Sequence, residues 1–195
     1  MSQSRPTPPP TTSTTTQIGP ASAPFTITPA TSPADVDSIR SLFAAYATWL
    51  DLDLSFQSFS SELASLPGAY SPPNGCLLLA RSSGSGLQPG APLGCVALRP
   101  LASQSSPAAP CAEMKRLYVV DPGRGMGVGK ALVRECVRRA RGMGYRYVKL
   151  DSLEEKMRGA VRLYEGLGFR KCARYYETPL QGTVFLELDL AEERR

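Results

Sequence analysis

The chain has 195 residues, 42% of them hydrophobic, which is enough for one folded domain with a buried core. It carries a net charge of +5 and contains no histidine. The commonest general base, every serine–histidine or cysteine–histidine nucleophile pair and most transition-metal sites are therefore excluded. No stretch approaches the ~20 apolar residues of a membrane helix, so we expect a soluble protein without a membrane partner.

The five cysteines are scattered along the chain and form no CxxC pair. An odd, dispersed set argues against a disulfide framework and against a zinc site, and it favours a reducing compartment. We therefore expect a cytoplasmic protein that binds no metal. The cysteines are Cys76, Cys95, Cys111, Cys136 and Cys172.

The positive charge belongs to the second half of the chain. Residues 1–112 hold four Lys/Arg and five Asp/Glu, whereas residues 113–195 hold eighteen and twelve. Such an excess suits either a nucleic acid or a polyphosphate cofactor. The arginines of 127–143 fall on solvent-facing helical positions without interleaved aromatic residues, so we expect no nucleic-acid partner.

The two ends of the chain differ in composition. Residues 1–24 are mostly Ser, Thr and Pro, and they contain too few apolar side chains to offset the entropy of ordering. We predict a disordered tail there, followed by a single domain over residues 25–191. The tail lacks the apolar core of a secretory signal and the several arginines of a mitochondrial presequence.

Hydrophobic periodicity and breaker residues divide the domain into strands and helices. Ser32 and Pro33 form a typical helix start, with an N-cap residue followed by proline at the first helical position. The pattern is that of a mixed α/β domain with one strand–loop–helix–strand unit. We predict strands over 25–30, 76–83, 93–101, 112–120, 147–153, 173–178 and 183–190, and helices over 33–50, 55–66, 127–143 and 155–167.

The segment DPGRGMGVGKAL (121–132) holds four glycines just before a predicted helix. It is not a P-loop, because Gly129-Lys130 is followed by Ala131 and Arg124 stands where the first glycine belongs. The dinucleotide pattern GxGxxG also fails in both possible registers. The segment does fit R-x-x-G-x-G, formed by Arg124, Gly127 and Gly129.

A helix start of this kind can bind phosphate. Its first N–H groups have no partner within the helix, and the helix dipole adds partial positive charge. Gly125, Gly127 and Gly129 allow a diphosphate to approach the backbone, and Lys130 could add a charged contact. The alternative is a glycine-rich turn without a ligand.

The R-x-x-G-x-G pattern, between a strand and a helix, resembles the signature of the GNAT superfamily of N-acetyltransferases. A second stretch, AVRLYEGLGF (160–169), resembles that family's later helix motif, and other stretches resemble a branch of small GNAT proteins. The resemblance covers most of the chain after the tail. It implies a mostly antiparallel twisted sheet of six or seven strands with about four helices, and acetyl-CoA as cosubstrate.

The resemblance also assigns residues to the cofactor. Leu117, Tyr118 and Val119 would pair with pantetheine through their backbone, although an ordinary central strand has the same sequence. Many family members have asparagine seven residues before the helix tyrosine, where this chain has Met157, which offers only apolar contact. The loop residues assigned to the pyrophosphate are Arg124, Gly125, Met126, Gly127, Val128, Gly129 and Lys130.

Two side chains are candidates for proton transfer. The resemblance places Tyr164 near the CoA sulfur, where a phenol with a pKa of about 10 could protonate the departing thiolate. Glu113 could deprotonate the amine acceptor, with Asp151 as the reserve. The alternatives are that Tyr164 only packs and that Glu113 forms an ion pair with Lys115 or Arg116.

We expect transfer of acetyl to a primary amine of a small molecule by direct attack, in a monomer or homodimer. Acetylation of protein lysines or N-termini, a CoA-binding module without turnover and covalent catalysis by Cys111 or Cys172 are the alternatives. The segment TPLQG (178–182) could be a loop over the acceptor site or only a hairpin turn. Aromatic residues that could line that site are Tyr46, Trp49, Phe56, Tyr70, Tyr175 and Tyr176.

Overall fold

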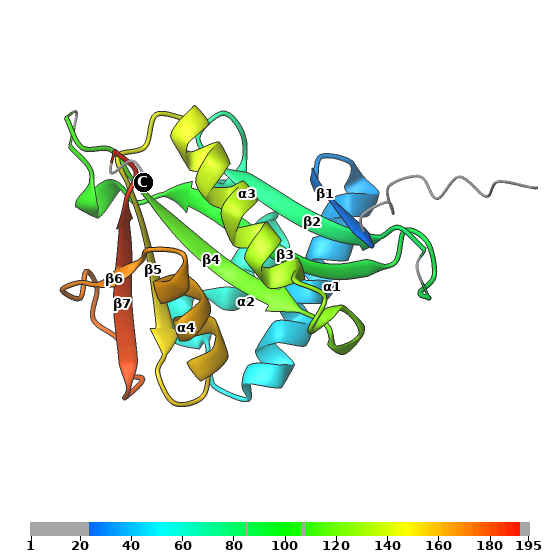
Figure 1. The fold of residues 1–195 in the computed structure, drawn as a ribbon. Coiled ribbons are helices and arrows are strands. Elements are labelled where there is room, and N and C mark those ends of the chain that lie inside the picture. The colour runs from blue at the N-terminus through cyan, green and yellow to red at the C-terminus, as the bar shows by residue number, and fades with distance from the viewer. Residues whose placement is uncertain (1–23, 85, 107, 192–195) are drawn as a thin grey trace, which may run out of the picture.

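A computed structural model describes residues 24–84, 86–106 and 108–191. Its centre is one seven-stranded sheet in the order β1-β2-β3-β4-β5-β7-β6 (Figure 1). Neighbouring strands are antiparallel except for β4 and β5, which are parallel. The strands are β1 Phe25–Pro29, β2 Cys76–Ser82, β3 Pro92–Pro100, β4 Cys111–Val119, β5 Tyr147–Leu153, β6 Arg170–Lys171 and β7 Thr183–Asp189.

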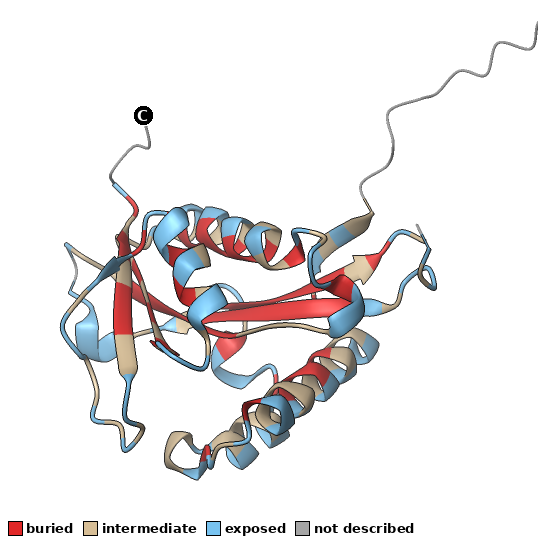
Figure 2. Cartoon of the chain, turned by 60° about the horizontal axis from the view of Figure 1, so that its bottom comes forward, coloured by how far each residue is buried: buried red, intermediate tan, exposed pale blue. Residues whose placement is uncertain are grey.

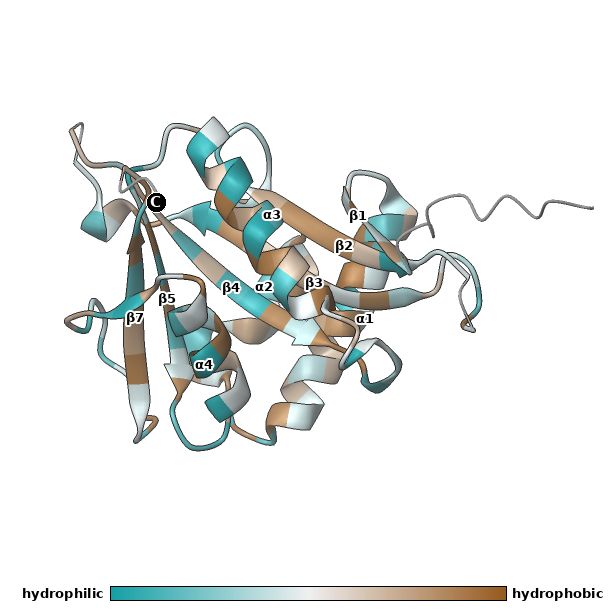
Figure 3. Ribbon diagram, viewed as in Figure 1, coloured by the Kyte–Doolittle hydropathy of each residue, from teal (hydrophilic) through white to brown (hydrophobic). Residues whose placement is uncertain are grey.

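Helices cover both faces of the sheet (Figures 1 and 2). Successive residues of β2 and β3 point to opposite faces of the sheet. Leu78 and Val96 therefore join one buried cluster, and Leu77 and Cys95 join the other. Hydrophobic residues, drawn in brown, predominate in β2 and β3, and the face of α3 that points away from the sheet carries hydrophilic residues, drawn in teal (Figure 3). The helices are α1 Pro33–Leu50, α2 Phe59–Ser65, α3 Val128–Gly142 and α4 Arg158–Gly166.

Most of the elements predicted from the sequence are found within a few residues of the expected bounds. Ser32 caps α1: its hydroxyl accepts the Asp35 N–H at 3.1 Å, and the Asp35 carboxylate accepts in return from the Ser32 N–H. No helix in the described part of the chain is both long and apolar enough to cross a membrane. The tail predicted over 1–24 lies outside the described residues, apart from Pro24.

The helix predicted over 55–66 is wrong in its first turn. Residues Ser55–Gln57 form a short 3-10 turn, Ser58 takes a left-handed conformation with φ of 55°, and α2 begins only at Phe59. The apolar spacing continues across this break, which is why the sequence pattern did not reveal it. Gln57 therefore ends the short turn and is not part of α2.

The strand predicted over 173–178 is also wrong, since those residues form an irregular segment and only Arg170–Lys171 pair with β7. Tyr175 and Tyr176 both pack on the ring of Phe185, with centroids 5.0 and 5.2 Å away. Consecutive residues of a strand point to opposite faces and could not both reach one ring. Packing of two adjacent tyrosines on one side therefore excludes a regular strand.

Candidate functional site

The sheet opens between its two parallel strands. Residues Cys111–Glu113 of β4 pair with Tyr147–Lys149 of β5, and the pairing ends there, although both strands continue. Beyond Glu113, the edge of β4 facing β5 has no strand partner among the described residues. The two strands diverge beyond this point (Figure 1), and residues of both line a cleft.

A bulge in β4 lies beside this cleft. The register between β3 and β4 shifts so that Cys95 faces Tyr118 but Ala97 faces Lys115, and Arg116 has a φ of 59°. A left-handed conformation is unfavourable for a residue with a side chain, so contacts elsewhere must stabilise it. The bulge bends β4 where it separates from β5.

A buried ion pair provides that stabilisation. The Arg116 guanidinium donates to both carboxylate oxygens of Glu62 on α2, at 3.0 and 2.6 Å, and lies over the ring of Phe59. Tyr70 donates a further hydrogen bond of 2.6 Å to Glu62. Burial alone raises the pKa of Glu62, but its hydrogen bonds and the charge of Arg116 lower it below its usual value. The pair ties α2 to the bulge.

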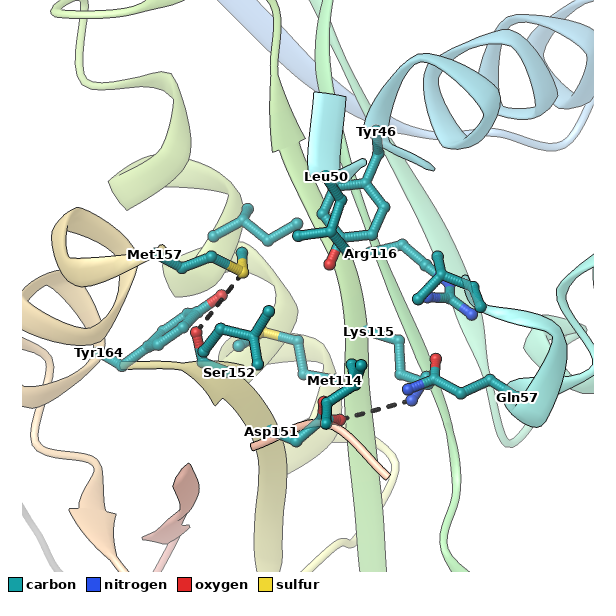
Figure 4. A pocket seen from close by; sticks show the side chains of 14 residues that line it. Tyr46, Leu50, Gln57, Met114, Lys115, Arg116, Asp151, Ser152, Met157 and Tyr164 are labelled. Atoms are coloured by element: carbon teal, nitrogen blue, oxygen red, sulfur yellow. Dashed lines mark hydrogen bonds and ion pairs between the residues drawn. The ribbon is translucent and has the colours of Figure 1, made fainter. Parts of the chain in front are cut away.

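The cleft is narrow, with a volume of about 40 Å³, and side chains from both faces of the sheet meet in it (Figure 4). Tyr46 and Leu50 of α1 approach from one side, and Met157 and Tyr164 lie on the other. Leu180, from the segment predicted as a possible cover, is also part of the lining.

Tyr164 points its hydroxyl toward the cleft beside Met157 and Ser152 (Figure 4). The side chain is 4% exposed, and no hydrogen bond of its hydroxyl is found within the described residues. Burial raises the pKa of Tyr164 above its usual value, so the phenol is protonated at neutral pH. Met157 stands directly before α4, and its sulfur accepts from Ser152 at 3.8 Å.

Glu113 is held by several partners. Arg99 contacts one carboxylate oxygen at 2.7 and 2.8 Å, while Lys115 and Tyr175 donate to the other at 3.4 and 3.2 Å. Burial on its own raises the pKa of Glu113, but the charges of Lys115 and Arg99 and the hydrogen bonds outweigh it. The lowered pKa makes this carboxylate a weak base.

A second pocket, of about 220 Å³, adjoins the cleft and is lined by Glu113 together with aromatic residues. Lys115 and Gln57 line both spaces. The buried Lys115 ammonium lies 3.5 Å from Asp151, which lines the cleft itself and is more exposed than Glu113 (Figure 4). The aromatic members of this second pocket are Phe56, Tyr175 and Tyr176.

The glycine loop leads from the end of β4 into α3. Gly125 and Gly127 have φ of 76° and 82°, and a Cβ at either would meet no atom within 4 Å. Gly123 differs, since its Cβ would lie 3.0 Å from the Leu93 carbonyl oxygen and would clash with the protein itself. Gly127 is the N-cap of α3 and supplies no side-chain hydrogen bond, so the first N–H groups of the helix remain open to a ligand.

The other predicted cofactor residues lie around this loop in different ways. Val128 is fully buried and offers only its backbone, whereas Lys130 faces an open groove between α3 and β1. Arg124 pairs with Asp121 at 2.6 Å and lies over the ring of Trp49. Leu117 lines the cleft, Tyr118 packs on Trp49, Val119 adjoins Gly129, and Met126 packs against the core.

Sequence reasoning missed Gln57 and the bridging position of Lys115. Both lie in stretches that resemble small GNAT proteins, but the sequence assigned neither a role, and the break at Ser58 that leaves Gln57 outside α2 has no sequence signature. Among the aromatic candidates, Tyr70 does not reach the site, because it is buried behind β3 and holds Glu62. Trp49 is exposed beside Arg124 rather than in the second pocket.

Replacing Glu62 with Gln tests the anchoring of the bulge. The variant leaves the Arg116 charge buried and unpaired, so we expect it to lower the free energy of unfolding by about 3 kcal/mol at pH 7 in urea denaturation. Glu62 has a lowered pKa, so its contribution is present above pH 4.5 and is lost as the pH falls below that value. The difference from wild type should therefore shrink in acid.

The exposed pair Glu154–Lys171 supplies the control. Glu154→Gln should cost less than about 1 kcal/mol. An equal effect of the two substitutions would contradict the anchoring role of Glu62.

The sequence matches the Acetyltransferase (GNAT) family over residues 36–169. An N-acetyltransferase of Schizosaccharomyces pombe, described as uncharacterized, is 36% identical over 160 residues, which cover 82% of this chain and 91% of that protein.

Solved structures share the fold. A proposed acyl-CoA N-acyltransferase of Klebsiella pneumoniae is 28% identical with a TM-score of 0.62, covering 87% of this chain and 99% of that one. NAA60 of Arabidopsis thaliana, solved in complex with acetyl-CoA, is 17% identical with a TM-score of 0.61 and covers 85% and 98%. On its sequence and its mixed, mostly antiparallel fold, the chain belongs to the GNAT family of acetyltransferases.

Proposed function

We propose that the protein transfers acetyl from acetyl-CoA, the cosubstrate of its family, to a primary amine of a small molecule by direct attack. The observation that carries this proposal is the unpaired edge of β4, which runs from the uncapped start of α3 to the cleft before Tyr164. A cofactor with a diphosphate at one end and a thioester at the other matches those two chemical environments.

The cofactor contacts follow from this placement. Backbone N–H groups at the start of α3 bind the pyrophosphate, and Gly125 and Gly127 leave space for its approach. The pantetheine arm pairs with the free edge of β4 along Leu117–Val119. Met157 then contacts the arm through its thioether, and the thioester carbonyl lies near Tyr164.

The reaction forms a C–N bond and breaks a C–S bond. The acceptor ammonium first loses a proton to Asp151, the carboxylate that lines the cleft. The neutral amine attacks the thioester carbonyl, and the departing sulfur takes a proton from Tyr164. The attacking nitrogen then gives up its second proton, which restores the Tyr164 phenol and leaves a neutral amide. Glu113, with its lowered pKa, contributes by fixing Lys115, and it stays the alternative base.

A covalent route through cysteine is disfavoured. Burial raises the pKa of Cys111 to about 11, which keeps its thiol protonated at neutral pH. Burial also raises the pKa of Cys172. Neither residue lines the cleft. These properties support direct transfer.

The second pocket supports a small acceptor. At about 220 Å³ it has room for a compact body, and Phe56, Tyr175 and Tyr176 offer aromatic surface to it. Its charged residues are Glu113, which is paired with Arg99 and Lys115, and Glu177. A protein lysine or N-terminus is the alternative acceptor, and it would need the Leu180 segment to move aside.

Gly127→Ala should weaken acetyl-CoA binding at least tenfold, because the added methyl group occupies the space left for the pyrophosphate. Trp49 is the single tryptophan of the chain and lies beside Arg124, so its fluorescence can follow the titration. Gly144→Ala is the matched control: Gly144 has the same φ of 82° and the same open space around its Cβ but follows the other end of α3, so it should show the backbone strain without the loss of affinity. Unchanged affinity in Gly127→Ala would refute the loop assignment.

Tyr164→Phe should lower kcat about 100-fold or more, as expected when a general acid is lost, while the KM for acetyl-CoA changes little. Release of CoA thiol is measured with a panel of small primary amines and with a peptide bearing a free N-terminus and a lysine. Tyr145→Phe, whose hydroxyl contacts Asn74 away from the cleft, serves as the control. Turnover of the peptide alone would contradict the small-molecule acceptor.

Asp151→Asn should lower kcat/KM for the amine about 100-fold near neutral pH. Activity should recover as the pH rises, because more of the amine is then already deprotonated. Glu113→Gln should show the smaller loss and no such recovery. If Glu113→Gln instead shows the large loss that recovers at high pH, and Asp151→Asn the smaller loss that does not, Glu113 is the base.

A further inference from the structure

We propose that Gln57 determines acceptor specificity: its Oε1 accepts an N–H of the attacking nitrogen and thereby selects primary over secondary amines. The inference rests on the proposed function, and it names the group that recognises the amine. Gln57 ends the short turn Ser55–Gln57 that precedes α2.

Gln57 stands where the two spaces of the site meet. Only Gln57 and Lys115, among the described residues, line both the cleft and the second pocket. A thioester in the cleft and an amine arriving through the pocket must meet at this junction. Lys115 is already engaged there, with Glu113 at 3.4 Å and Asp151 at 3.5 Å.

One hydrogen bond orients the side-chain amide of Gln57. Its Nε2 donates to the Tyr176 hydroxyl at 3.5 Å. Burial, followed by the charge of Asp151, raises the pKa of Tyr176, so its phenol is protonated at neutral pH. With Nε2 directed to the Tyr176 hydroxyl, Oε1 is the atom of the amide that is left without this contact.

Oε1 of Gln57 has no hydrogen-bond partner among the described residues. It is the one buried side-chain nitrogen or oxygen, within the part of the chain that the structure describes, that lacks a hydrogen bond. Buried acceptors are almost always satisfied, and leaving one unpaired is costly. An unpaired acceptor at the meeting point of two pockets therefore indicates a donor on the ligand.

The attacking nitrogen supplies that donor. A neutral primary amine carries two N–H groups and one lone pair. One N–H donates to Asp151, which has just taken the third proton of the ammonium, and the other donates to Oε1 of Gln57. The lone pair is then left to attack the thioester. An N-methyl group would replace the second N–H and leave Oε1 unpaired against a methyl group.

The test compares two amine pairs that differ by one methyl group: phenethylamine with N-methylphenethylamine, and butylamine with N-methylbutylamine. For each pair, kcat/KM is measured by thiol release, and affinity for the CoA-bound protein is measured by calorimetry. Wild type should prefer the primary amine about 100-fold, in the range seen when a site loses one polar partner.

Gln57→Met keeps the length of the side chain but removes the acceptor, so the preference should fall at least tenfold. Gln57→Glu retains an acceptor oxygen and should keep most of the preference, which separates hydrogen bonding from packing. Gln88→Met, at an exposed position in the β2–β3 connection, is the matched control and should behave as wild type.

Each outcome is decisive. A wild-type preference in Gln57→Met, or equal use of both amines by wild type, overturns the inference and leaves the acetyltransferase proposal intact. Binding of the primary amine that depends on Gln57, without thiol release, supports the inference and overturns the proposed function. Absence of both binding and transfer for all four amines overturns both.

Discussion

The separation of β4 from β5 after three paired residues is the constraint on which the rest of the site depends. A central sheet that stops pairing exposes a row of backbone groups in the middle of the domain, where water alone would otherwise satisfy them. The bulge at Arg116 bends β4 at this point, and the buried pair with Glu62 holds an unfavourable backbone conformation in place. The fold thus maintains an unfavourable backbone conformation where the sheet opens, which is typical of a binding site.

The chemistry of the site follows from the absence of histidine. In the proposed mechanism carboxylates and a phenol carry the proton transfers, and the fold places them in different surroundings. Glu113 is buried among cations that lower its pKa, whereas Asp151 lies at the cleft beside a single lysine. Tyr164 is raised in pKa by burial and remains a donor. The proposed mechanism assigns Glu113 to fixing charge, Asp151 to accepting a proton and Tyr164 to donating one.

The sequence revealed the parts of the site that are local in the chain. The glycine loop, the cap of α1, the strand before the loop and the position of Tyr164 on a later helix are all encoded within a few residues. Features that depend on contacts between distant segments could not be predicted from the sequence. The divergence of β4 and β5, the packing of Tyr175 and Tyr176 on Phe185, and the entry of Gln57 through a break at Ser58 each depend on contacts between distant segments. Apolar spacing is the same on both sides of that break, so no pattern could place Gln57 in the site.

The most direct test of this account is a crystal structure of the protein with acetyl-CoA. The account predicts the pyrophosphate within hydrogen-bond distance of the backbone N–H groups at the start of α3. It also predicts pantetheine along Leu117–Val119 between the diverging strands, and the thioester sulfur near the Tyr164 hydroxyl. Acetyl-CoA bound outside this cleft, or a β4 edge left free in the complex, would contradict the claim that the opening of the sheet is the cofactor site.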